Sequence, residues 1–411
     1  MKFTNYFIKT RKTASKDQDS KNARYFYRSG MVDKHMAGIY ALLPLGLKVY
    51  RKIESIVREE MNAVNGQEIL MNVLQPQALW EETGRFTKMD EIFYKTQGRS
   101  GKELGLAPTH EEQVVDIARK YIDSYKDLPL SLYQIQVKFR NEARAKSGLL
   151  RGREFIMKDM YSFHLNVTDF DHYYERVKQA YIKMFARMGL EVMVVKASGG
   201  AFSEFSDEFQ LAIEIGEDDV YVCDGCARSL NKEIVAEGDR ERCDFCQSEW
   251  RIVKGVEVGN IFPLGDKFAR DMNFTVLNEN GASIYPIMGC YGIGLGRLMG
   301  VLAEKYFNEE TGKMTWPKEL APFDCQLISI DKNEEAQKIY DELNKVGIDV
   351  LYDDREVSAG AKLADADLIG CGRKIIISKK SLAAGGAEWM DNYADEAKII
   401  KIDLLPGLML K

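Results

Sequence analysis

A chain of 411 residues with 45% hydrophobic and 29% charged residues is long and apolar enough for two or three globular domains. Its apolar runs fall short of the roughly 20 residues that a membrane span needs, and its first residues lack the apolar stretch of a secretory signal, so we expect neither a membrane protein nor a secreted one. The net charge of −6 does not indicate a uniformly basic nucleic-acid-binding protein, although the distribution of charge matters more than the total. Seven cysteines in such a chain indicate a reducing compartment, and we expect a cytoplasmic location.

Positive charge is concentrated at the amino-terminus. Residues 1–30 contain eight Lys and Arg residues and two Asp residues. A basic arm of this kind can follow a phosphate backbone, and it can equally be a solvated tail. The sequence leaves both interpretations open.

An amphipathic helix is predicted between Leu47 and Met61, where apolar residues recur at helical spacing and charged residues fill the opposite side. Residues 38–46 are expected to form a turn-like stretch before it. After the helix, Glu68–Leu74 is predicted to form a strand that stops before Pro76. A helix, a turn and a strand in this order are common, and most such helices only cover a core.

The segment from Glu103 to Glu112 is predicted to change from strand to helix at its proline. Thr109 is well placed to cap the helix, with Glu112 as its capping-box partner. That interpretation leaves His110 and Glu111 unexplained. Because a carboxylate beside a hydroxyl suits a cation, Thr109 and Glu111 are also candidates for a cation-binding site.

Two strands joined by a loop are predicted over Tyr133–Asn141 and Glu154–Phe163, since both are rich in aromatic and β-branched residues and a turn signal lies between them. This hairpin is strongly basic. Its cations are Lys138, Arg140, Arg144, Lys146, Arg151, Arg153 and Lys158. Arginines on paired strands form rigid forks that suit a polyphosphate, and a solvated hairpin with surface ion pairs is the alternative.

A helix over Asp169–Leu190 is predicted from aromatic and apolar residues at helical spacing, and these side chains are expected to belong to the core. Strands are expected over Glu191–Val195 and Glu208–Ile215, with a glycine-containing loop at residues 199–203 between them.

Four cysteines form two CxxC knuckles, Cys223 with Cys226 and Cys243 with Cys246, separated by 16 residues. Each knuckle places two thiolates on one tight turn, and two knuckles close a tetrahedral zinc site without an open position. A structural zinc ion is therefore predicted. A redox or disulfide role and an independent nucleic-acid-binding ribbon are the alternatives.

A strand over Gly255–Phe262 is followed by a second strand that runs into several glycines before a helix at about Leu295. Those glycines let the backbone approach a ligand or a neighbouring strand closely. Arg297 lies in the first turn of this mostly apolar helix, where it needs an anion or another partner. The glycine spacing does not fit a dinucleotide-binding fold.

From Asp324 strands and helices alternate, which indicates a small α/β domain of about 90 residues. Strands are predicted over Cys325–Ile330, Asp349–Tyr352 and Lys374–Ser378, and helices over Glu334–Val346 and Leu363–Leu368. Residues 324–411 contain 12 Lys and Arg residues against 17 Asp and Glu residues. Residues 353–355 (DDR) and 362–367 (KLADAD) resemble the anticodon-binding domain of the proline, threonine, glycine and histidine tRNA synthetases. The resemblance implies RNA binding, and because the domain has a net charge of −5, we expect a few residues to read unstacked bases, with Arg355, Lys362 and Arg373 as candidates.

Several of these segments resemble the motifs of class II aminoacyl-tRNA synthetases, in the form found in bacterial prolyl-tRNA synthetases. Residues 139–142 (FRNE) and 151–155 (RGREF) resemble motif 2, and residues 288–299 (MGCYGIGLGRLM) resemble motif 3. The predicted helix and strand between Leu47 and Leu74 resemble motif 1, and residues 109–111 resemble the TXE loop. Residues 255–262 are similar to the GIEVGHIF segment of the family, with Asn260 in place of the usual His.

The resemblance implies an α+β catalytic domain with a central antiparallel sheet over residues 1–318, a zinc-ribbon-like insertion at residues 220–254, and a C-terminal α/β anticodon-binding domain over residues 324–411. It also implies the reaction, in which proline and ATP form prolyl-adenylate and the prolyl group then passes to the 3′ end of proline tRNA. ATP, Mg²⁺ bound with the substrate and a structural Zn²⁺ ion are the implied cofactors.

The resemblance also assigns residues to these tasks. Arg140 and Arg297 would act in catalysis by holding the α- and γ-phosphates. The implied ATP-binding residues are Arg140, Glu142, Arg151, Phe155 and Arg297. The implied proline-binding residues are Thr109, Glu111, Arg140, Met157, Asp159, Phe163 and Cys290, and Ser203 and Glu208 would border the same pocket.

One departure from the family is visible. Bacterial members usually carry a large editing domain between motifs 2 and 3, whereas about 70 residues separate Gly216 from Met288 here. We therefore expect that the chain does not hydrolyse alanyl-tRNA, and that its partners are proline tRNA, a second copy in a homodimer and a separate editing protein. A class II synthetase for another amino acid and a non-catalytic tRNA-binding paralogue remain as alternatives.

Overall fold

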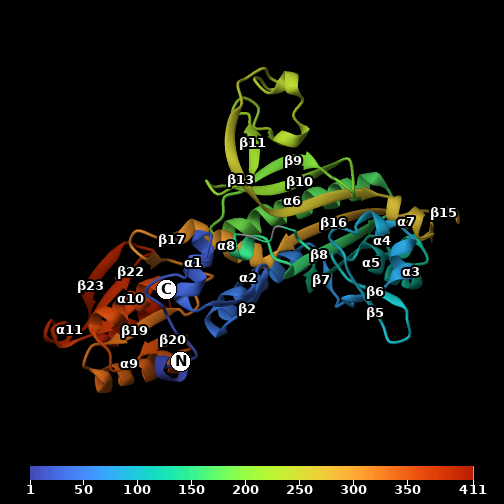
Figure 1. The fold of residues 1–411 in the computed structure, drawn as a ribbon. Helices are drawn as coiled ribbons and strands as arrows, with labels where there is room; N and C mark the ends of the chain where they lie inside the picture. Colours follow the sequence, from blue (N-terminus) through green and yellow to red (C-terminus); the bar gives the residue numbers. More distant parts are fainter. Residues whose placement is uncertain (144, 146, 411) are drawn as a thin grey trace. The chain divides into compact units, whose positions relative to one another are not determined.

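The computed structural model describes residues 1–143, 145 and 147–410 (Figure 1). The chain divides into two compact units. The terminal unit contains Met1–Ile53, Lys146–Leu149 and Met299–Lys411, and the central unit contains Glu54–Ala145 and Leu150–Leu298. The functional domain limits predicted above, 1–318 and 324–411, remain a prediction.

A nine-stranded sheet runs through the central unit in the order β10-β9-β12-β11-β13-β16-β8-β7-β3 (Figure 1). Its strands are β3 (Gln67–Glu68), β7 (Leu130–Phe139), β8 (Glu154–His164), β9 (Met193–Ser198), β10 (Phe205–Ala212), β11 (Asp218–Val222), β12 (Ser229–Asn231), β13 (Arg251–Gly265) and β16 (Ile287–Gly294). β7 pairs with β8, β8 with β16 and β16 with β13, all antiparallel. The predicted central antiparallel sheet is therefore confirmed.

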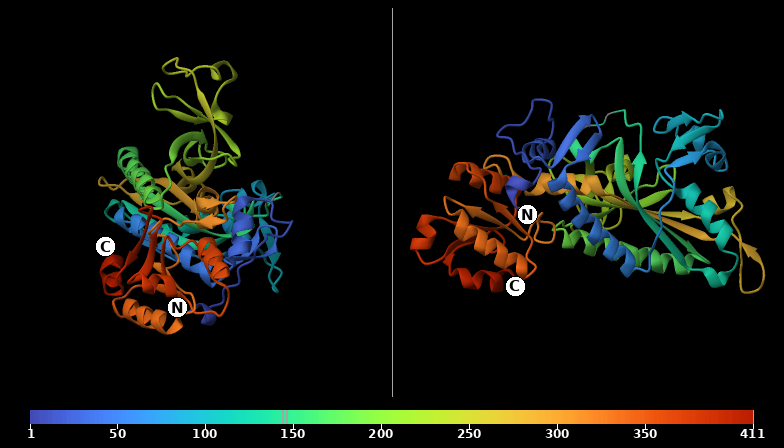
Figure 2. Two further views of the ribbon diagram at one scale, coloured as in Figure 1. Left: turned by 90° about the vertical axis from the view of Figure 1, so that its left-hand side faces the viewer. Right: turned by 90° about the horizontal axis from the view of Figure 1, so that it is seen from below.

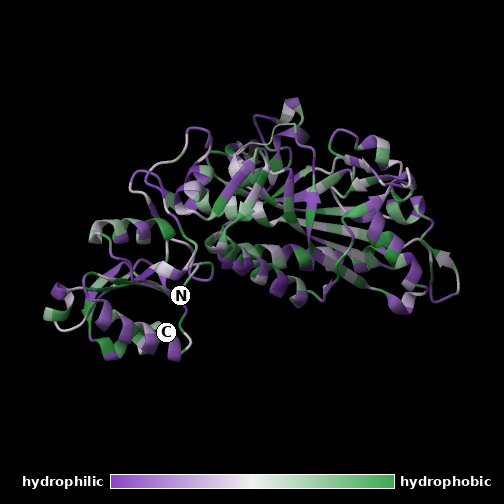
Figure 3. Cartoon of the chain, turned by 60° about the horizontal axis from the view of Figure 1, so that its bottom comes forward, coloured by the Kyte–Doolittle hydropathy of each residue, from purple (hydrophilic) through white to green (hydrophobic). Residues whose placement is uncertain are grey.

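Helix α6 (Val167–Arg187) packs against β8, β13 and β16. It begins after Asn166, whose side chain accepts a hydrogen bond from the N–H of Asp169, as expected for a helix cap. Its buried residues recur at helical spacing: Phe170, Tyr173, Val177, Ala180, Tyr181, Met184 and Phe185. Hydrophobic and hydrophilic residues alternate along the long helices in Figure 3, so the amphipathic pattern that predicted this helix is confirmed.

A second core lies beside one end of the sheet, where Trp80, Phe86, Phe93 and Phe268 are buried together. The helices around it are α3 (Gln77–Glu81), α4 (Arg85–Lys88), α5 (Glu111–Tyr121) and α7 (Lys267–Asp271). The short strands around it are β4 (Leu74–Pro76), β5 (Tyr94–Gln97), β6 (Glu103–Leu106), β14 (Val276–Leu277) and β15 (Ser283–Ile284). This packing holds the start of α5 beside the sheet.

The prediction of one strand over Glu68–Leu74 is wrong. Only Gln67–Glu68 and Leu74–Pro76 are strands. Between them, side chains replace the ladder: the N–H of Met71 donates to the Gln134 side chain at 3.0 Å, and the Gln136 side chain donates to the Met71 carbonyl at 2.9 Å. Two glutamines of β7 therefore satisfy the backbone where a neighbouring strand would otherwise do so.

The terminal unit contains a five-stranded sheet in the order β20-β19-β21-β22-β23. Its strands are β19 (Cys325–Ser329), β20 (Val350–Asp353), β21 (Arg373–Ile377), β22 (Ala387–Asp391) and β23 (Glu396–Ile400). Its helices are α9 (Asn333–Lys345), α10 (Ala359–Ile369), α11 (Lys379–Ala383) and α12 (Leu405–Met409). β19 pairs in parallel with β20 and β21, so the predicted small α/β domain is confirmed.

The amino-terminal part of the same unit contains α1 (Lys21–Ser29) and the antiparallel pair β1 (Val32–Met36) and β2 (Ile39–Leu42). The turn-like stretch predicted at residues 38–46 is therefore partly a strand. The short strands β17 (Phe307–Asn308) and β18 (Lys313–Met314) belong here. The helices α2 (Pro44–Ala63) and α8 (Leu295–Tyr306) begin and end at residues assigned to different units. Among the described residues, no helix is both long and apolar enough to cross a bilayer.

Candidate functional site

Two arginines from distant parts of the chain belong to the central unit and are near enough to interact electrostatically. Arg140 follows β7, where its N–H donates to the Arg153 carbonyl at 2.8 Å and its Nε donates to the Pro108 carbonyl at 3.2 Å. Arg297 lies in the first turn of α8, where its Nε donates to the Leu150 carbonyl at 3.1 Å. Each side chain is thus fixed by a backbone carbonyl and keeps part of its guanidinium group for other partners.

The two guanidinium groups are close enough to affect one another. Burial lowers the pKa of Arg140 most, and the positive charge of Arg297 lowers it further. Glu257 offsets part of this charge, because its carboxylate accepts a hydrogen bond from Arg297 Nη1 at 2.7 Å. The structure therefore brings Arg140 and Arg297 together, and such a pair of cations suits an anion with several charges.

The other predicted ATP-binding residues lie at or beside the connection between β7 and β8. Phe155 lies 5.4 Å from the Arg140 guanidinium, measured to the ring centroid. Arg151 is half-buried, with Nη2 3.6 Å from a carboxylate oxygen of Glu217. The Glu142 carbonyl accepts a hydrogen bond from Arg153 Nε at 3.0 Å. Two cations of the predicted basic hairpin, Arg144 and Lys146, lie outside the described residues.

Thr109 and Glu111 are in direct contact. The Thr109 hydroxyl lies 2.9 and 2.7 Å from the two carboxylate oxygens of Glu111, and Cys290 Sγ lies 3.3 Å from one of them. The predicted capping box is wrong: α5 starts at Glu111 after His110, and the Thr109 hydroxyl binds a carboxylate instead of the helix backbone. Charge explains the difference. The Thr109 hydroxyl donates to an ionised carboxylate, and this charge-assisted hydrogen bond is stronger than the bond that a neutral hydroxyl would accept from a helix N–H.

Arg85 is a member of this cluster that the sequence did not reveal. Its Nη1 lies 3.1 Å from carboxylate oxygens of Glu111 and Glu112, and all three side chains are buried. The rings of Trp80, Phe202 and Phe268 surround its guanidinium at 4.9 to 5.4 Å. The residues around it, such as Glu81, Glu82, Thr87 and Lys88, are mostly polar or charged, so the sequence gives no local signal that Arg85 is buried.

Alternate residues of β8 share one face of the sheet, which groups Phe155, Met157, Asp159 and Phe163. On the neighbouring strand, Cys290 pairs with Tyr161, a residue of the same face. The structure therefore brings Met157 and Cys290 to the face that carries Phe155. Phe163 is fully buried and packs against Phe274 with ring centroids 5.7 Å apart.

Asp159 is buried, and its carboxylate contacts a cation and two hydrogen-bond donors. Its carboxylate lies 2.7 Å from Lys138 Nζ and accepts hydrogen bonds from Gln134 and Tyr161, each at 2.9 Å. Burial acts to raise the pKa of Asp159, but the charges of Lys138 and His110 outweigh burial and hold this pKa below its ordinary value. Asp159 thus acts on this face through the side chains that it orients, including Tyr161.

Glu208 is close enough to Glu257, the carboxylate partner of Arg297, to be affected by its charge. It accepts hydrogen bonds from Gln210 at 2.6 Å and Asn260 at 3.3 Å. Burial and then the charge of Glu257 raise the pKa of Glu208 to about 7. Ser203 instead donates to the Phe205 carbonyl at 2.7 Å and therefore only shapes its own loop.

The four cysteines of the two knuckles converge in a segment that projects from the central sheet (Figures 1 and 2). Their sulfur atoms all lie within 4.8 Å of one another. In each knuckle the first cysteine donates its N–H to a carbonyl five residues later, at 2.8 Å, so the two turns are built alike. Four converging thiol groups suit a tetrahedral zinc ion.

The three candidates for reading RNA bases are held within the terminal unit. Arg355 Nη2 lies 2.6 Å from Asp353 and 2.8 Å from Asp365. Lys362 is buried and donates to the Ser329 carbonyl at 2.6 Å, and Arg373 Nε donates to Asp391 at 3.1 Å. Their contacts favour a structural role, and their role in reading bases stays a prediction.

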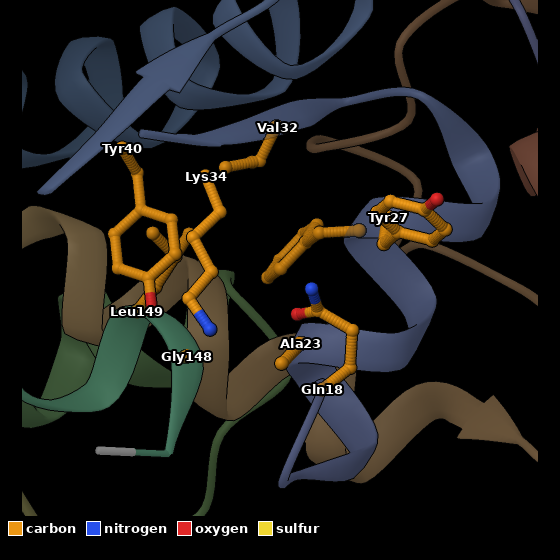
Figure 4. A pocket seen from close by; sticks show the side chains of 9 residues that line it. Gln18, Ala23, Tyr27, Val32, Lys34, Tyr40, Gly148 and Leu149 are labelled. Atoms are coloured by element: carbon orange, nitrogen blue, oxygen red, sulfur yellow. The ribbon is translucent and has the colours of Figure 1, made fainter. Parts of the chain in front are cut away.

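A small hollow in the terminal unit lies beside the connection between the hairpin strands (Figure 4). Gly148 and Leu149 line it together with residues of the amino-terminal segment, which are Gln18, Ala23, Phe26, Tyr27, Val32, Lys34 and Tyr40. Its lining contains the end of the predicted basic hairpin and none of the residues predicted to bind ATP or proline.

Comparisons with known proteins extend these observations. A family model described as the tRNA synthetase class II core domain (G, H, P, S and T) matches residues 94–306, and one described as an anticodon binding domain matches residues 324–406. The chain is 38% identical over 421 residues to a proline-tRNA ligase of Anaplasma phagocytophilum, with 98% of each chain covered. It is 38% identical over 418 residues to a proline-tRNA ligase of Nitrobacter winogradskyi, covering 94% of this chain and 95% of the relative.

A solved structure, Giardia lamblia prolyl-tRNA synthetase in complex with prolyl-adenylate, has a similar fold. The TM-score is 0.73 at 19% sequence identity, with 92% of this chain and 73% of the other chain covered.

Proposed function

Because the chain belongs to the proline-tRNA ligase family of class II aminoacyl-tRNA synthetases, we propose that it activates proline with ATP and transfers the prolyl group to the 3′ end of proline tRNA. The observation that carries the proposal is that Arg140 and Arg297, two cations from distant parts of the chain, are each held by a backbone carbonyl and interact electrostatically. In this proposal residues 1–318 form the catalytic domain and residues 324–411 bind the anticodon.

The chemistry needs no protein nucleophile. The carboxylate of proline attacks the α-phosphorus of ATP, the bond to the bridging oxygen breaks, and pyrophosphate leaves. Arg140 holds the α-phosphate and Arg297 the γ-phosphate, so both stabilise charge that builds in the transition state. Glu142 and Arg151 position ATP, Phe155 stacks on adenine, and Mg²⁺ bound with ATP shares the phosphate charge.

The proposed amino-acid site is explained by the unequal number of positive and negative charges in the cluster that contains Arg85. One guanidinium group lies between the two buried carboxylates of Glu111 and Glu112, which leaves a negative charge for a cation to balance. The ammonium group of proline supplies that cation beside Thr109 and Glu111. Met157, Phe163 and Cys290 then form the apolar surroundings of the proline ring, and Asp159, on the same face of β8, orients the Tyr161 side chain.

The test is ATP–pyrophosphate exchange measured with each amino acid. We expect proline to support exchange, and Arg297→Ala to lower it by about 10²–10³-fold, as for the loss of a preorganised transition-state donor. Arg270→Ala is the matched control, because Arg270 is an exposed cation whose carboxylate partner is Asp266 of the preceding turn. Exchange with none of the amino acids would contradict the proposal and favour a non-catalytic paralogue.

We also propose a structural zinc ion on Cys223, Cys226, Cys243 and Cys246, whose converging sulfurs support it. The family resemblance supports a homodimer, a cytoplasmic location and a separate editing protein as a partner. Relatives covered over 98% of their length lack room for a large inserted domain, which supports the absence of editing in this chain.

A further inference from the structure

The first residues of the chain are built onto the sheet of the terminal unit. The amino-terminal ammonium group of Met1 donates to the Val350 carbonyl at 2.6 Å, and the Tyr352 N–H donates to the Met1 carbonyl at 2.9 Å. Lys2 forms a parallel bridge with Tyr352. Because β20 is an edge strand of its sheet, residues 1–2 extend that sheet by one short strand.

Side chains fix the following residues of this amino-terminal arm (residues 1–20). The Thr4 hydroxyl donates to Asp354 at 2.7 Å, and the Thr10 hydroxyl donates to Asp365 at 2.5 Å. The Phe3 ring lies 3.6 Å from the guanidinium of Arg355, measured to the ring centroid. The arm is therefore an ordered part of the unit, which excludes the interpretation of a solvated tail.

The arm turns cations and an aromatic ring toward solvent. Lys9, Lys12 and Lys16 are exposed, and in the part of the chain that the structure describes no carboxylate pairs with them. Phe7 is 73% exposed although the neighbouring Tyr6 packs on Phe323. Exposed cations beside an exposed aromatic ring are typical of surfaces that bind single-stranded nucleic acid, since the ring stacks on a base and the cations contact phosphates.

The two acids within the arm already have partners. Asp17 pairs with Lys34 at 3.3 Å, and Asp19 accepts the N–H of Ser147 at 3.2 Å. The arm belongs to a segment with eight Lys and Arg against two Asp residues, whereas residues 324–411 carry 12 against 17 acids. Residues 324–411 thus have a net negative charge, whereas the arm offers cations that are unpaired among the described residues, of the kind that contact RNA phosphates.

We propose that Phe7, Lys9, Lys12 and Lys16 form an RNA-binding strip on the terminal unit, which contacts backbone phosphates and one unstacked base of the tRNA. This inference rests on the proposed function for the identity of the RNA. The strip is separate from the chemistry, because every residue that is proposed to bind ATP or proline belongs to the central unit.

The experiment compares the binding of a proline tRNA transcript with ATP–pyrophosphate exchange, which requires no tRNA. The triple variant Lys9→Glu, Lys12→Glu and Lys16→Glu is expected to raise the Kd for tRNA by at least about tenfold and to reduce its salt dependence, with unchanged exchange and thermal stability. Phe7→Ala is expected to raise the Kd by about fivefold through lost stacking. The matched control reverses the exposed lysines Lys338, Lys345 and Lys379, which alters the net charge equally.

Each outcome decides the question. The proposal is supported if the control variant binds the tRNA more tightly than the arm variant does. It is overturned if both triple variants lose the same affinity for the tRNA, or if the arm variant binds the tRNA as tightly as the wild-type chain. If the wild-type chain shows no exchange with proline, the proposed function fails, while the comparison of tRNA binding still decides the role of the arm.

Discussion

The N–H and the side-chain amide of Asn22 both donate to one oxygen of Glu304, at 2.8 and 2.6 Å, although 282 positions separate the two residues. Both residues are buried. Asn22 also donates to the Ser147 carbonyl at 3.1 Å and accepts the N–H of Leu149 at 3.2 Å. One asparagine therefore holds α1, α8 and the connection between the two hairpin strands.

Replacement of Asn22 by Ala is expected to lower the free energy of unfolding by about 1–3 kcal/mol, because the buried Glu304 carboxylate loses the side-chain amide donor and keeps only the backbone N–H of residue 22. It is also expected to raise the KM for ATP severalfold in exchange assays. Leu149 precedes Leu150, whose carbonyl holds Arg297, so a loosened connection weakens the grip on the phosphates. Urea denaturation and exchange kinetics measure the two effects.

The control for Asn22 is Arg24→Ala. Arg24 is close to Asn22 in sequence, but its interaction is expected to contribute less to the free energy of unfolding. Arg24 pairs with Glu309 in an exposed ion pair, with side chains 35% and 40% exposed. Such a pair contributes about 0–1 kcal/mol. Equal effects of the two substitutions on the KM for ATP would contradict the role given to Asn22.

Arg85→Met is expected to lower the free energy of unfolding by about 3–5 kcal/mol, because it leaves Glu111 and Glu112 buried without their shared cation. The KM for proline should rise as well, since Glu111 loses the partner that orients it. Denaturant unfolding and exchange at varied proline concentration provide the measurements. Arg119→Met is the control, because Arg119 binds Glu82 and Asp116 where solvent reaches all three; a loss as large as that of Arg85 would refute the argument.

Much of this architecture was predictable because it depends on local periodicity. The strands of the hairpin were predicted from aromatic and β-branched residues and a turn signal, the helix near residues 169–190 from helical spacing, and the two CxxC knuckles from spacing and residue type. Arg85 and Asn22 were missed for a different reason. Their partners lie 26 and 282 positions away, and nothing in the neighbouring residues identifies which buried charge a polar side chain will meet.

The two local errors have the same origin. Thr109 has the residue type and position of a cap, but a carboxylate two residues later competes for its hydroxyl. Residues 68–74 have the composition of a strand, but glutamine side chains of β7 bind the backbone between Glu68 and Leu74. In both cases a side-chain hydrogen bond replaces the backbone interaction that local rules assume.

Stability is expected to decrease as the pH falls from about 6.5 to about 4, with His110 as one cause. Burial, and then the charge of Lys138, lower the pKa of His110 to about 4 in the folded chain. The unfolded chain therefore binds a proton in this range that the folded chain does not bind, and the contribution is on the order of 2–3 kcal/mol. Urea denaturation across this range measures it. His110→Gln should remove this part of the slope, and an equal change in the exposed His172→Gln variant would count against it.

Alanine is expected to support exchange with a kcat/KM about 10–200-fold below that of proline, since an apolar pocket discriminates between substrates that differ by a few methylene groups by only about 1–3 kcal/mol.

We also expect the purified chain to leave alanyl-tRNA intact, because the segment between β10 and β16 is occupied by the cysteine knuckles and strands of the sheet, where bacterial members of the family usually carry an editing domain. Deacylation assays with alanyl-tRNA measure this, and hydrolysis above the uncatalysed rate would contradict it.

Removal of zinc is expected to loosen the cysteine segment while most of the exchange activity persists. Four thiolates close a structural site, and no residue proposed to bind ATP or proline lies between Cys223 and Cys246. Elemental analysis should give about one zinc ion per chain, and Cys226→Ser should lose it and speed amide hydrogen exchange in this segment without changing that of β7. Cys371→Ser is the control, because Cys371 is a buried cysteine of the terminal unit. Retention of zinc in Cys226→Ser, or its loss in Cys371→Ser, would place the metal elsewhere and refute the assignment.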